Sequence, residues 1–435
     1  MLKEDDAAGN IPARDSGRFN RAVRLYADEP DEKKLRLIVI ISDGIRGHIN
    51  QSRGVAAWLS RDSGAEVEEI GIPELKGAVR RHVRASASKL IAGDRHKARE
   101  WLALARGEGV VRALGQLLLE RGIREGQTSS LIILSAGSIP AFFNLALGYI
   151  WRCTCVTIMT PSVVGTDPFQ FAIVPEHDYP GDEANVMTTV GAPNSIVKEE
   201  LGFVGESLLR EFPPKREYRW GILIGGNDKN YRISAEWMHR EVGKILREAV
   251  RGDVDLYIST SRRTSPEAEN AIRRMVSSCE NTRFLLIASS DPFNPIPAIL
   301  GACDEIFVTD DSVNMVSEAV TAGHRVILLR TERAGAVKQR LQLATSAMVS
   351  SGIFPRRALW GVPRFDETFR SFRNMGLLID FKDWIHERRR SDIAQIYVPD
   401  DKGEFDKDGF NEARRAAGWI LSSLPGIVRP EDEMR

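Results

Sequence analysis

The stretch VTDDSVNMVSEAVTAGHRVILL, residues 308–329, constrains the fold of this chain more than any other segment. The sequence predicts a buried strand over Ile306–Thr309, which is apolar and β-branched, and another over Val326–Leu329. A helix should lie between them, because Asp311 and Ser312 can cap its start and a glycine can end it. Two strands joined by a helix are typical of a parallel βαβ unit, so the sheet must carry helices on its faces.

The N-terminus of the helix that follows this strand is a candidate anion site. Unpaired N–H groups and the helix macrodipole attract phosphate at such a terminus, beside Asp311 and Ser312. Asn314 and Glu318 are four residues apart and therefore share one face of the helix. A carboxylate such as that of Glu318 can accept two hydrogen bonds from the vicinal hydroxyls of a ribose. These features predict a site for a nucleotide diphosphate, although a capped helix with a solvated Glu318 explains the same residues equally well.

The alternation of strands and helices runs through the chain twice, on either side of a Pro-rich charged linker over 211–216. We therefore expect two α/β units, over 35–210 and 217–353, with a flexible leader over 1–34 and a helical and loop tail over 354–435. The fold class that follows is α/β, with two facing doubly wound, Rossmann-like parallel sheets. The expected strands are Leu35–Ile41, Val67–Ile72, Leu131–Leu134, Cys153–Met159, Phe171–Val174, Trp220–Ile224, Leu256–Ser259, Phe284–Ala288, Ile306–Thr309 and Val326–Leu329.

Composition restricts the class of protein. The chain has 435 residues, too many for a single hydrophobic core, and its sixty basic residues balance sixty acidic ones. The zero net charge gives no argument for a nucleic acid partner, and we expect none. The four cysteines lack zinc spacing, and the longest apolar run, Ile139–Trp151, is too short to cross a bilayer. The polar N-terminus does not have the pattern of a signal peptide, so we expect a cytoplasmic protein.

Two further turns in the second half complete the candidate donor site. Gly225 and Gly226 follow a strand in LIGGNDKN, where glycines allow close backbone approach and the N–H groups up to Asn227 could hold a phosphate. Ser261 and Arg262 lie just past another strand end, where ligands bind in open α/β sheets, and the guanidinium fork suits phosphate oxygens. Taken alone, each segment is equally an ordinary turn. Together, the three segments should lie along one edge of the sheet.

The first half offers a candidate base. The segment SDGIRGHINQ places Asp43 and His48 in a strand-to-helix turn, where the histidine could remove a proton near neutral pH. Asp43 could orient the imidazole or act as the base itself, whereas a loop histidine bonded to backbone is the competing interpretation. Glu176, His177 and Asp178 follow a later strand. Because adjacent residues in one turn seldom ligate the same ion, we expect an orienting or structural role there and no metal.

Several segments together resemble the mitochondrial-fission (elongated-mitochondria) family and its bacterial relatives, which are described as glycosyltransferases. The resemblance implies a GT-B architecture, two facing α/β units with a nucleotide-sugar between them. It also implies a non-enzymatic alternative, because the plant member is a membrane-associated fission factor that recruits a dynamin-like protein. The chain departs from the family at DPF, in a basic insertion and in its tail. The matching segments are SDGIRGHINQSRG, SAG, DPFQFAIVPEHD, TTVGAPN, LIGGNDKNYR, STSRRT and DDSVNMVSEA.

The basic insertion, Leu75–Arg112, has ten Lys or Arg against three Asp or Glu. This excess indicates a surface that meets an anionic lipid or an anionic glycan, which would place the protein peripherally on a membrane. A solvated amphipathic helix pair explains the same segment equally well.

From these features we expect a glycosyltransferase that moves a sugar from a nucleotide diphosphate-sugar to a hydroxyl acceptor, with cell-envelope glycan synthesis as one setting. The second half would hold the donor, and the first half the acceptor and the base, His48. The nucleotide-sugar would be a substrate, with no cofactor and no metal, because helix dipoles and arginine can stabilise the leaving diphosphate. A nucleotide-sugar epimerase on the same fold and a membrane-associated fission-type adaptor are the alternatives. The oligomeric state is left open.

Overall fold

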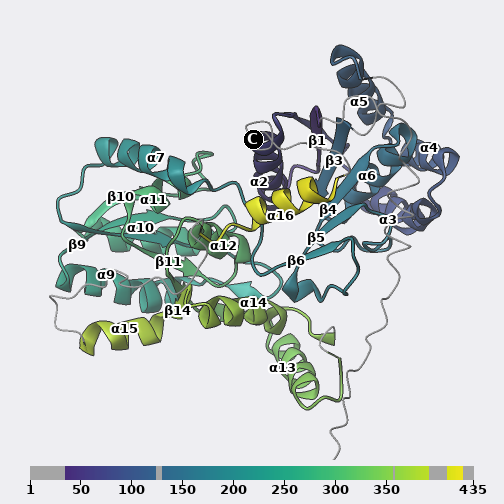
Figure 1. The fold of residues 1–435 in the computed structure, drawn as a ribbon. Coiled ribbons are helices and arrows are strands. Elements are labelled where there is room, and N and C mark those ends of the chain that lie inside the picture. Colours follow the sequence, from purple (N-terminus) through teal and green to yellow (C-terminus); the bar gives the residue numbers. More distant parts are fainter. Residues whose placement is uncertain (1–34, 124–129, 356–357, 391–408, 425–435) are drawn as a thin grey trace, which may run out of the picture.

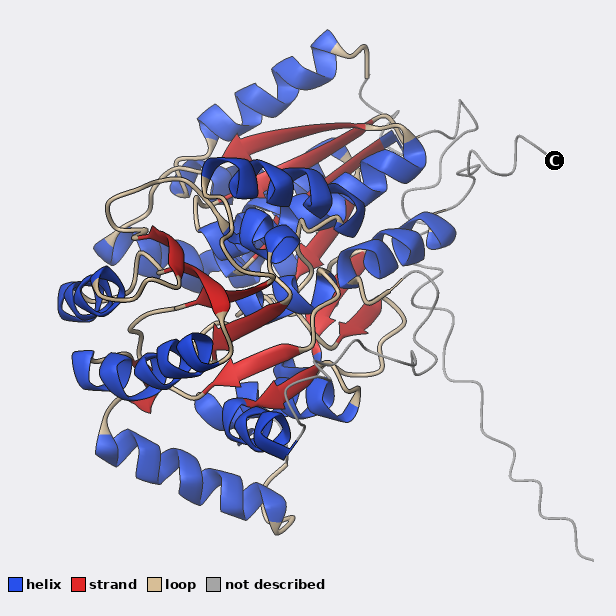
Figure 2. Cartoon of the chain, turned by 90° about the vertical axis from the view of Figure 1, so that its left-hand side faces the viewer, coloured by secondary structure: helices blue, strands red, loops and turns tan. Residues whose placement is uncertain are grey.

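The computed structural model describes residues 35–123, 130–355, 358–390 and 409–424, so the leader expected over 1–34 lies outside the described residues. Within them the chain forms two α/β units, each built on a six-stranded sheet (Figure 1). Figure 2 shows the strands of both sheets enclosed between layers of helices. This arrangement confirms the predicted fold class, α/β with two doubly wound parallel sheets.

The first sheet has the strand order β2-β1-β3-β4-β5-β6, and all its neighbouring strands are parallel. Side chains of β1 alternate between its faces: Leu37, Val39 and Ile41 join one core, whereas Ile38 and Ile40 join the other. Burial on both faces explains why this strand is a continuous apolar run. The strands are β1 (Leu37–Ser42), β2 (Glu66–Gly71), β3 (Leu131–Ala136), β4 (Thr154–Ile158), β5 (Phe171–Pro175) and β6 (Val186–Thr189).

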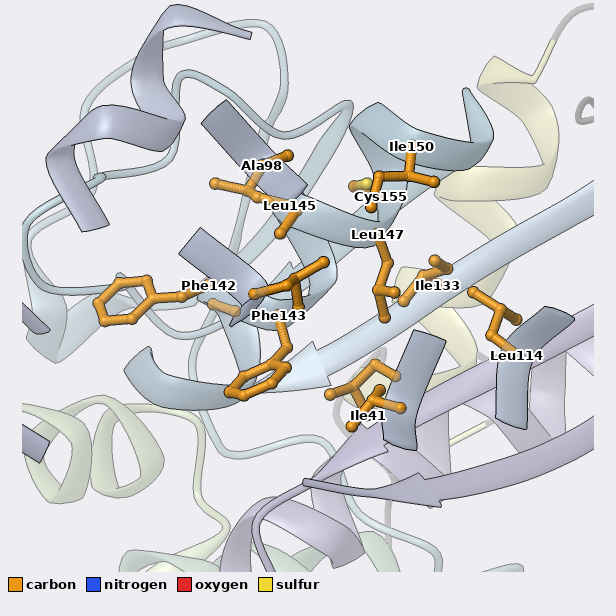
Figure 3. Packing of buried hydrophobic residues seen from close by; sticks show 14 of the residues in the cluster. Ile41, Ala98, Leu114, Ile133, Phe142, Phe143, Leu145, Leu147, Ile150 and Cys155 are labelled. Atoms are coloured by element: carbon orange, nitrogen blue, oxygen red, sulfur yellow. The ribbon is translucent and has the colours of Figure 1, made fainter. Parts of the chain in front are cut away.

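Helices cover both faces of this sheet, and one core is centred on α6 (Figure 3). There Phe143 packs in the same cluster as Ile41 and Ile133 of the sheet, and Trp101 makes edge-on contacts with Phe142 and Phe143 at centroid distances of 6.0 and 5.2 Å. The helices are α2 (Arg46–Ser63), α3 (Gly77–Ser86), η1 (Ala87–Ala92), α4 (Arg95–Leu104), α5 (Glu108–Glu120), α6 (Ser138–Trp151), η3 (Glu176–Asp178) and α7 (Lys198–Glu211).

The basic insertion, Leu75–Arg112, forms α3, η1, α4 and the start of α5. Its apolar side chains, Val83 and Trp101 among them, pack into the first core, while Arg80 and Arg84 are exposed. The segment is therefore an amphipathic set of helices docked on the first unit, and its contact with an anionic surface stays a prediction. Among all helices in the described ranges, none has the length and apolarity required to cross a bilayer.

The second sheet has the order β10-β9-β7-β11-β12-β14, again all parallel. Its strands are β7 (Tyr218–Leu223), β9 (Val254–Ser259), β10 (Thr282–Leu286), β11 (Glu305–Thr309), β12 (Val326–Leu329) and β14 (Leu378–Asp380), beside a two-stranded ribbon of β8 (Tyr231–Arg232) and β13 (Glu332–Arg333). Its helices are α8 (Ala235–Trp237), the π turn η4 (Met238–Val242), α9 (Gly243–Arg251), α10 (Pro266–Ser277), α11 (Ile296–Ala302), α12 (Val313–Thr321), α13 (Ala336–Ser350), α14 (Val362–Asn374) and α15 (Phe381–Arg390).

The last described helix, α16 (Glu412–Ser423), returns to the first unit and packs against α2 (Figure 1). Ala413 and Ile420 are fully buried in the core that includes Ile38 and Ile40, on the other face of the first sheet, and Trp419 meets Phe171 edge-on at 5.0 Å. The stretch expected as a tail over 354–435 thus contributes β14 to the second sheet and α16 to the first unit.

Candidate functional site

Both sheets contain a point at which the winding of the chain reverses. It lies between β1 and β3 in the first sheet and between β7 and β11 in the second. Ligands of doubly wound sheets bind outside the carboxyl ends of the strands at such points. The loops after these four strands carry most of the residues that the sequence singled out, so each candidate cluster lies where this fold places ligands.

At the first switch point, Asp43 and His48 are in contact. The imidazole Nδ1 lies 3.1 and 3.2 Å from the two carboxylate oxygens, and the Ile45 N–H donates to the same carboxylate at 3.1 Å. Burial disfavours the Asp43 carboxylate, but the hydrogen bond and charge of His48 outweigh it and hold the pKa of Asp43 below its ordinary value. When Nδ1 donates to Asp43, Nε2 is the nitrogen left to accept a proton.

The imidazole of His48 rests on Gly137, the glycine of the SAG turn after β3. Gly137 has φ +85°, and a Cβ placed on it would lie 2.4 Å from His48 Cε1. The glycine is therefore required twice, for its backbone conformation and for the space that the ring occupies. The segment after β1 and the turn after β3 together hold the candidate base, His48.

At the second switch point, Asp311 joins three loops. Its buried carboxylate accepts hydrogen bonds from the Gly226 N–H at 2.9 Å, the Thr309 hydroxyl at 2.7 Å and the Arg263 guanidinium at 3.0 Å. Burial raises the pKa of Asp311 to about 6, although these three donors favour the ionised form. Asp311 therefore closes the loop cluster and does not cap α12.

The glycine pair is held tightly within this cluster. A Cβ on Gly225 would lie 2.0 Å from an Asp311 carboxylate oxygen, and one on Gly226 would lie 2.1 Å from the Arg263 carbonyl carbon. The backbone N–H groups of Gly225, Gly226 and Asn227 donate to Thr309, Asp311 and Arg263 respectively. Here the two glycines let protein loops, and not a ligand, approach one another.

The neighbouring turn after β9 separates its two arginines. The guanidinium of Arg263 turns toward Asp311. Ser261 accepts the Arg263 N–H at 3.2 Å and so shapes the turn, and Asn227 accepts the Ile233 N–H at 2.7 Å in the loop after β7. Both arginines, Arg262 and Arg263, are exposed, and Arg263 is the one that pairs with Asp311.

Helix α12 begins as the sequence predicts, with Ser312 as its cap. The Ser312 hydroxyl accepts the Met315 N–H at 3.4 Å. The expectation that Asn314 and Glu318 share a face is also confirmed, because both are hydrogen-bonded by α2 of the first unit. Gln51 donates to Asn314 at 3.3 Å and Asn50 donates to Glu318 at 2.5 Å.

Glu318 lies in a seam between the two units and is not solvated. Its side chain is buried, and burial raises its pKa to about 7 even though the hydrogen bond from Asn50 favours the ionised form. The Ser195 hydroxyl donates to the other end of Asn50, at its Oδ1 atom, over 2.5 Å. The candidate ribose-binding carboxylate is thus held by a chain of hydrogen bonds from the first unit.

The seam continues along the segment that follows β6. The Ala192 N–H donates to the Ser317 hydroxyl at 3.0 Å, and the Asn194 amide donates to the Thr321 hydroxyl at 3.0 Å. Gly54 on α2 faces the same segment, and a Cβ there would lie 2.2 Å from the Asn194 carbonyl oxygen. α2, this segment and α12 are therefore in close contact.

Sequence reasoning missed the α2 side of the seam. Gly47, Asn50, Gln51 and Gly54 lie at helical spacing on one face of α2, and a Cβ on Gly47 would lie 2.7 Å from Asn314 Nδ2. This stripe was a usable signal, because glycine and asparagine have low helix propensity. Asp310 was also missed. It accepts the Thr331 N–H and hydroxyl and pairs with Arg330 and Arg333, anchoring the loop after β12.

The segment Glu176–Asp178 contacts α14 of the second unit. His177 Nδ1 lies 3.0 Å from the Thr368 hydroxyl on α14, and Asp178 pairs with Arg364. Burial lowers the pKa of His177 to about 4. Within the described ranges, no group of three His, Cys, Asp or Glu side chains is arranged to hold a metal ion.

Comparison with known proteins gives one match of family rank. The family model described as mitochondrial fission ELM1 matches residues 46–424 of the chain, which takes in both units and α16. No curated protein matches the sequence.

Several solved structures resemble this chain at low sequence identity and with TM-scores below 0.5. UDP-GlcNAc 2-epimerase from Methanocaldococcus jannaschii shares 10% identity at a TM-score of 0.48, covering 89% of this chain and 99% of that chain. UDP-GlcNAc 2-epimerase from Neisseria meningitidis, bound to UDP-GlcNAc, shares 13% identity at a TM-score of 0.40, covering 78% of this chain and 98% of that chain. A glycosyl transferase of family 9 from Veillonella parvula shares 11% identity at a TM-score of 0.38, covering 80% of this chain and 99% of that chain.

Proposed function

This chain belongs to the mitochondrial fission ELM1 family, and from that premise we propose that it transfers a sugar from a nucleotide diphosphate-sugar to a hydroxyl acceptor. The observation that carries the proposal is the pairing of two switch points. A histidine held by a carboxylate lies at one, and a capped helix with a buried carboxylate lies at the other. α2 and α12 join them directly through Asn50 and Glu318.

In this proposal the second unit holds the donor. Glu318 accepts the ribose hydroxyls, Ser312 and Asn314 border the diphosphate at the N-terminus of α12, and Arg262 approaches the phosphates from solvent. Gly225, Gly226, Asn227, Ser261 and Asp311 set the shape of the loops beside it. The Asn50 amide is hydrogen-bonded to Glu318. The nucleotide would therefore displace this amide, and α2 and α12 would move apart as the nucleotide binds.

The first unit supplies the acceptor side and the base. His48 Nε2 takes the proton of the acceptor hydroxyl while that oxygen attacks the anomeric carbon of the sugar. The bond between the anomeric carbon and the diphosphate oxygen breaks, and the diphosphate leaves with the electron pair. Asp43 orients the imidazole and stabilises the imidazolium that forms. The helix N-terminus and Arg262 stabilise the charge that develops on the leaving diphosphate.

The test is incubation of the full chain with UDP-, GDP- and ADP-sugars, with calorimetry of the corresponding nucleotides. Transfer or hydrolysis supports the proposal, an isomerised sugar replaces it with an epimerase, and the lack of any binding or turnover replaces it with an adaptor. Glu318→Ala should weaken nucleotide binding by about 1.5–3 kcal/mol for each charge-assisted hydrogen bond lost.

A matched control is Glu305→Ala. Glu305 is another largely buried carboxylate, at the amino end of β11, where it accepts a hydrogen bond from Trp384. Because it lies at the end of the sheet away from the switch point, its loss should leave nucleotide affinity unchanged. Equal affinities for the nucleotide in folded Glu318→Ala and Glu305→Ala variants would exclude the donor site.

A further inference from the structure

Helix α13 carries an apolar stripe that faces solvent. Val337, Leu341, Ala344 and Met348 follow one another at spacings of four, three and four residues, which places them on one face of the helix. Val337 is 73% exposed, Leu341 57% and Met348 41%. A surface helix of a globular protein normally turns such a stripe toward the core.

A neighbouring face of α13, about 100° around the helix from the stripe, is polar and turns toward the protein. Gln342 is the buried residue of this helix and donates to Asn230 at 3.3 Å. Lys338 donates to the Lys229 carbonyl at 2.8 Å, and Thr345 accepts the indole N–H of Trp360 at 3.4 Å. Hydrogen bonds on this polar face therefore dock α13, and the apolar stripe beside it is left outside.

The exposed apolar surface extends past the helix. Ile353 and Phe354 after the helix are also exposed, and we call these two residues together with Val337, Leu341 and Met348 the α13 face. α13 stands out from the second unit at the lower edge of Figure 1. Clustered exposed apolar side chains of this kind mark an interaction surface.

The charges around the α13 face decide between partners. From Gly335 to Trp360 the sequence contains no Asp or Glu, while Lys338 and Arg340 lie on the helix itself. Lys338 is held by the Lys229 carbonyl, whereas Arg340 is exposed. A second copy of the chain, docked by twofold symmetry, would bring two copies of Arg340 to one interface with no carboxylate from this stretch to pair them. An anionic lipid surface satisfies both features, because it receives apolar side chains and attracts cations.

We propose that the α13 face inserts into the surface of an anionic lipid bilayer and holds the protein there. The helix would lie in the plane of the membrane, with its stripe among the acyl chains and Arg340 at the headgroups. This contact does not depend on nucleotide-sugar binding. It is also separate from the basic insertion Leu75–Arg112, which lies on the other unit.

The experiment is flotation of the full chain, without nucleotide, with phosphatidylcholine vesicles and with vesicles that also contain phosphatidylserine. The wild type should bind the phosphatidylserine vesicles, and less so at high salt. The variant Val337→Ser/Leu341→Ser/Met348→Ser should lose this binding by more than about tenfold, because each large aliphatic side chain kept in water weakens partition by about that factor. The single variant Leu341→Ser should show the smaller loss, of about tenfold, that one side chain contributes.

A matched control removes the same number of exposed apolar side chains elsewhere. Leu119, Phe203 and Val250 are 81%, 72% and 60% exposed on α5, α7 and α9, and their triple replacement by Ser should leave binding intact. Equal binding by the α13 variants and the wild type would overturn the proposal, as would a wild type that floats with neither vesicle. A wild-type dimer in solution that the α13 variants abolish would assign the face to a second copy instead.

Discussion

The side-chain amide of Asn50 donates a hydrogen bond of 2.5 Å to Glu318, and the two residues lie 268 positions apart on helices of different units. Glu318 is the carboxylate that the proposed donor site requires, so its present partner matters for function. A ribose that takes the place of Asn50 exchanges one hydrogen-bond donor for two. If Glu318 binds the donor as proposed, donor binding and the contact between α2 and α12 are coupled through this single carboxylate.

Replacing Asn50 by Asp should separate the two units at neutral pH. Two carboxylates at this distance cannot both be ionised without strong repulsion, and protonation of one would be needed to keep the seam closed. We expect a larger radius of gyration in solution scattering at pH 8 than at pH 5. Gln51→Glu is the control, because Gln51 faces the Asn314 amide, which can donate to a carboxylate after a flip. An unchanged radius of gyration in Asn50→Asp at both pH values would contradict this coupling.

The pH dependence of stability should report on Glu318. Burial raises its pKa to about 7 in the folded chain, above the ordinary value of 4.5, so the folded state binds the proton more tightly than the unfolded state. Between these pH values the folded state carries more protons, and the free energy of unfolding must therefore fall as pH rises from 4.5 to 7. Glu318→Gln, which does not titrate, should remove a decline on the order of 2 kcal/mol.

Urea unfolding of the wild type and Glu318→Gln at several pH values measures this difference. Asp311 contributes to the same decline, since burial raises its pKa to about 6, and it stays in both proteins. The comparison therefore isolates Glu318. Identical pH profiles for the two proteins would mean that Glu318 is solvated in solution.

The close approach of α2 to the segment after β6 predicts a strong effect of a single methyl group. Gly54→Ala would place a Cβ 2.2 Å from a backbone oxygen of Asn194, which must move away. We expect a loss of about 1–3 kcal/mol in the free energy of unfolding, as is typical of overpacking. Gly202→Ala on α7 meets nothing within 4 Å and should stabilise by up to about 1 kcal/mol, through helix propensity. Thermal denaturation of both variants decides the point.

The fold was predictable because its signals are local. β12 lies at the expected Val326–Leu329, and β11 differs from expectation by one residue, since strands buried on both faces must be apolar along their length. β14 was not predicted, because three residues hydrogen-bonded to β12 leave almost no pattern in the sequence. The π turn Met238–Val242 between α8 and α9 was not predicted either.

The site was harder to predict because its geometry depends on distant loops. Asp311 and Ser312 are both able to cap α12, and which of them does so is decided by Gly226 and Arg263, far away in the sequence. The stripe on α2 marks Asn50 as part of a contact face, but nothing in the local sequence identifies Glu318 as its partner. Sequence identifies the residue types available at each strand end, whereas the partners they select depend on how the two units dock.

Replacing Asp311 and Arg262 by alanine should have different effects, because Asp311 stabilises the loops of the second unit whereas Arg262 is proposed to bind the diphosphate. Asp311→Ala would leave the Gly226 N–H and the Arg263 guanidinium without their buried acceptor, at a cost on the order of 3 kcal/mol in stability. Arg262→Ala removes an exposed side chain and should change stability by less than about 0.5 kcal/mol, while weakening nucleotide diphosphate binding. Urea unfolding and calorimetry of both variants test this division. Stability losses of similar size in the two variants would contradict it.

Gly137→Ala should displace the candidate base, His48, although it leaves that residue itself unchanged. A methyl group there would meet the imidazole of His48 and force it away from Asp43, in a backbone conformation that disfavours any side chain. Burial would then act on Asp43 without the opposing hydrogen bond, so the pKa of its carboxyl group should rise, as carbon NMR of that group can measure. Turnover should fall about 10²–10⁴-fold, as in His48→Ala, and adding His48→Ala to Gly137→Ala should cause no further loss.

Asp43→Asn should lower turnover while leaving nucleotide affinity intact, because Asp43 and His48 both lie on the proposed acceptor side. A Gly137→Ala variant with full transfer activity and an unshifted Asp43 carboxyl would place the base elsewhere in the first unit.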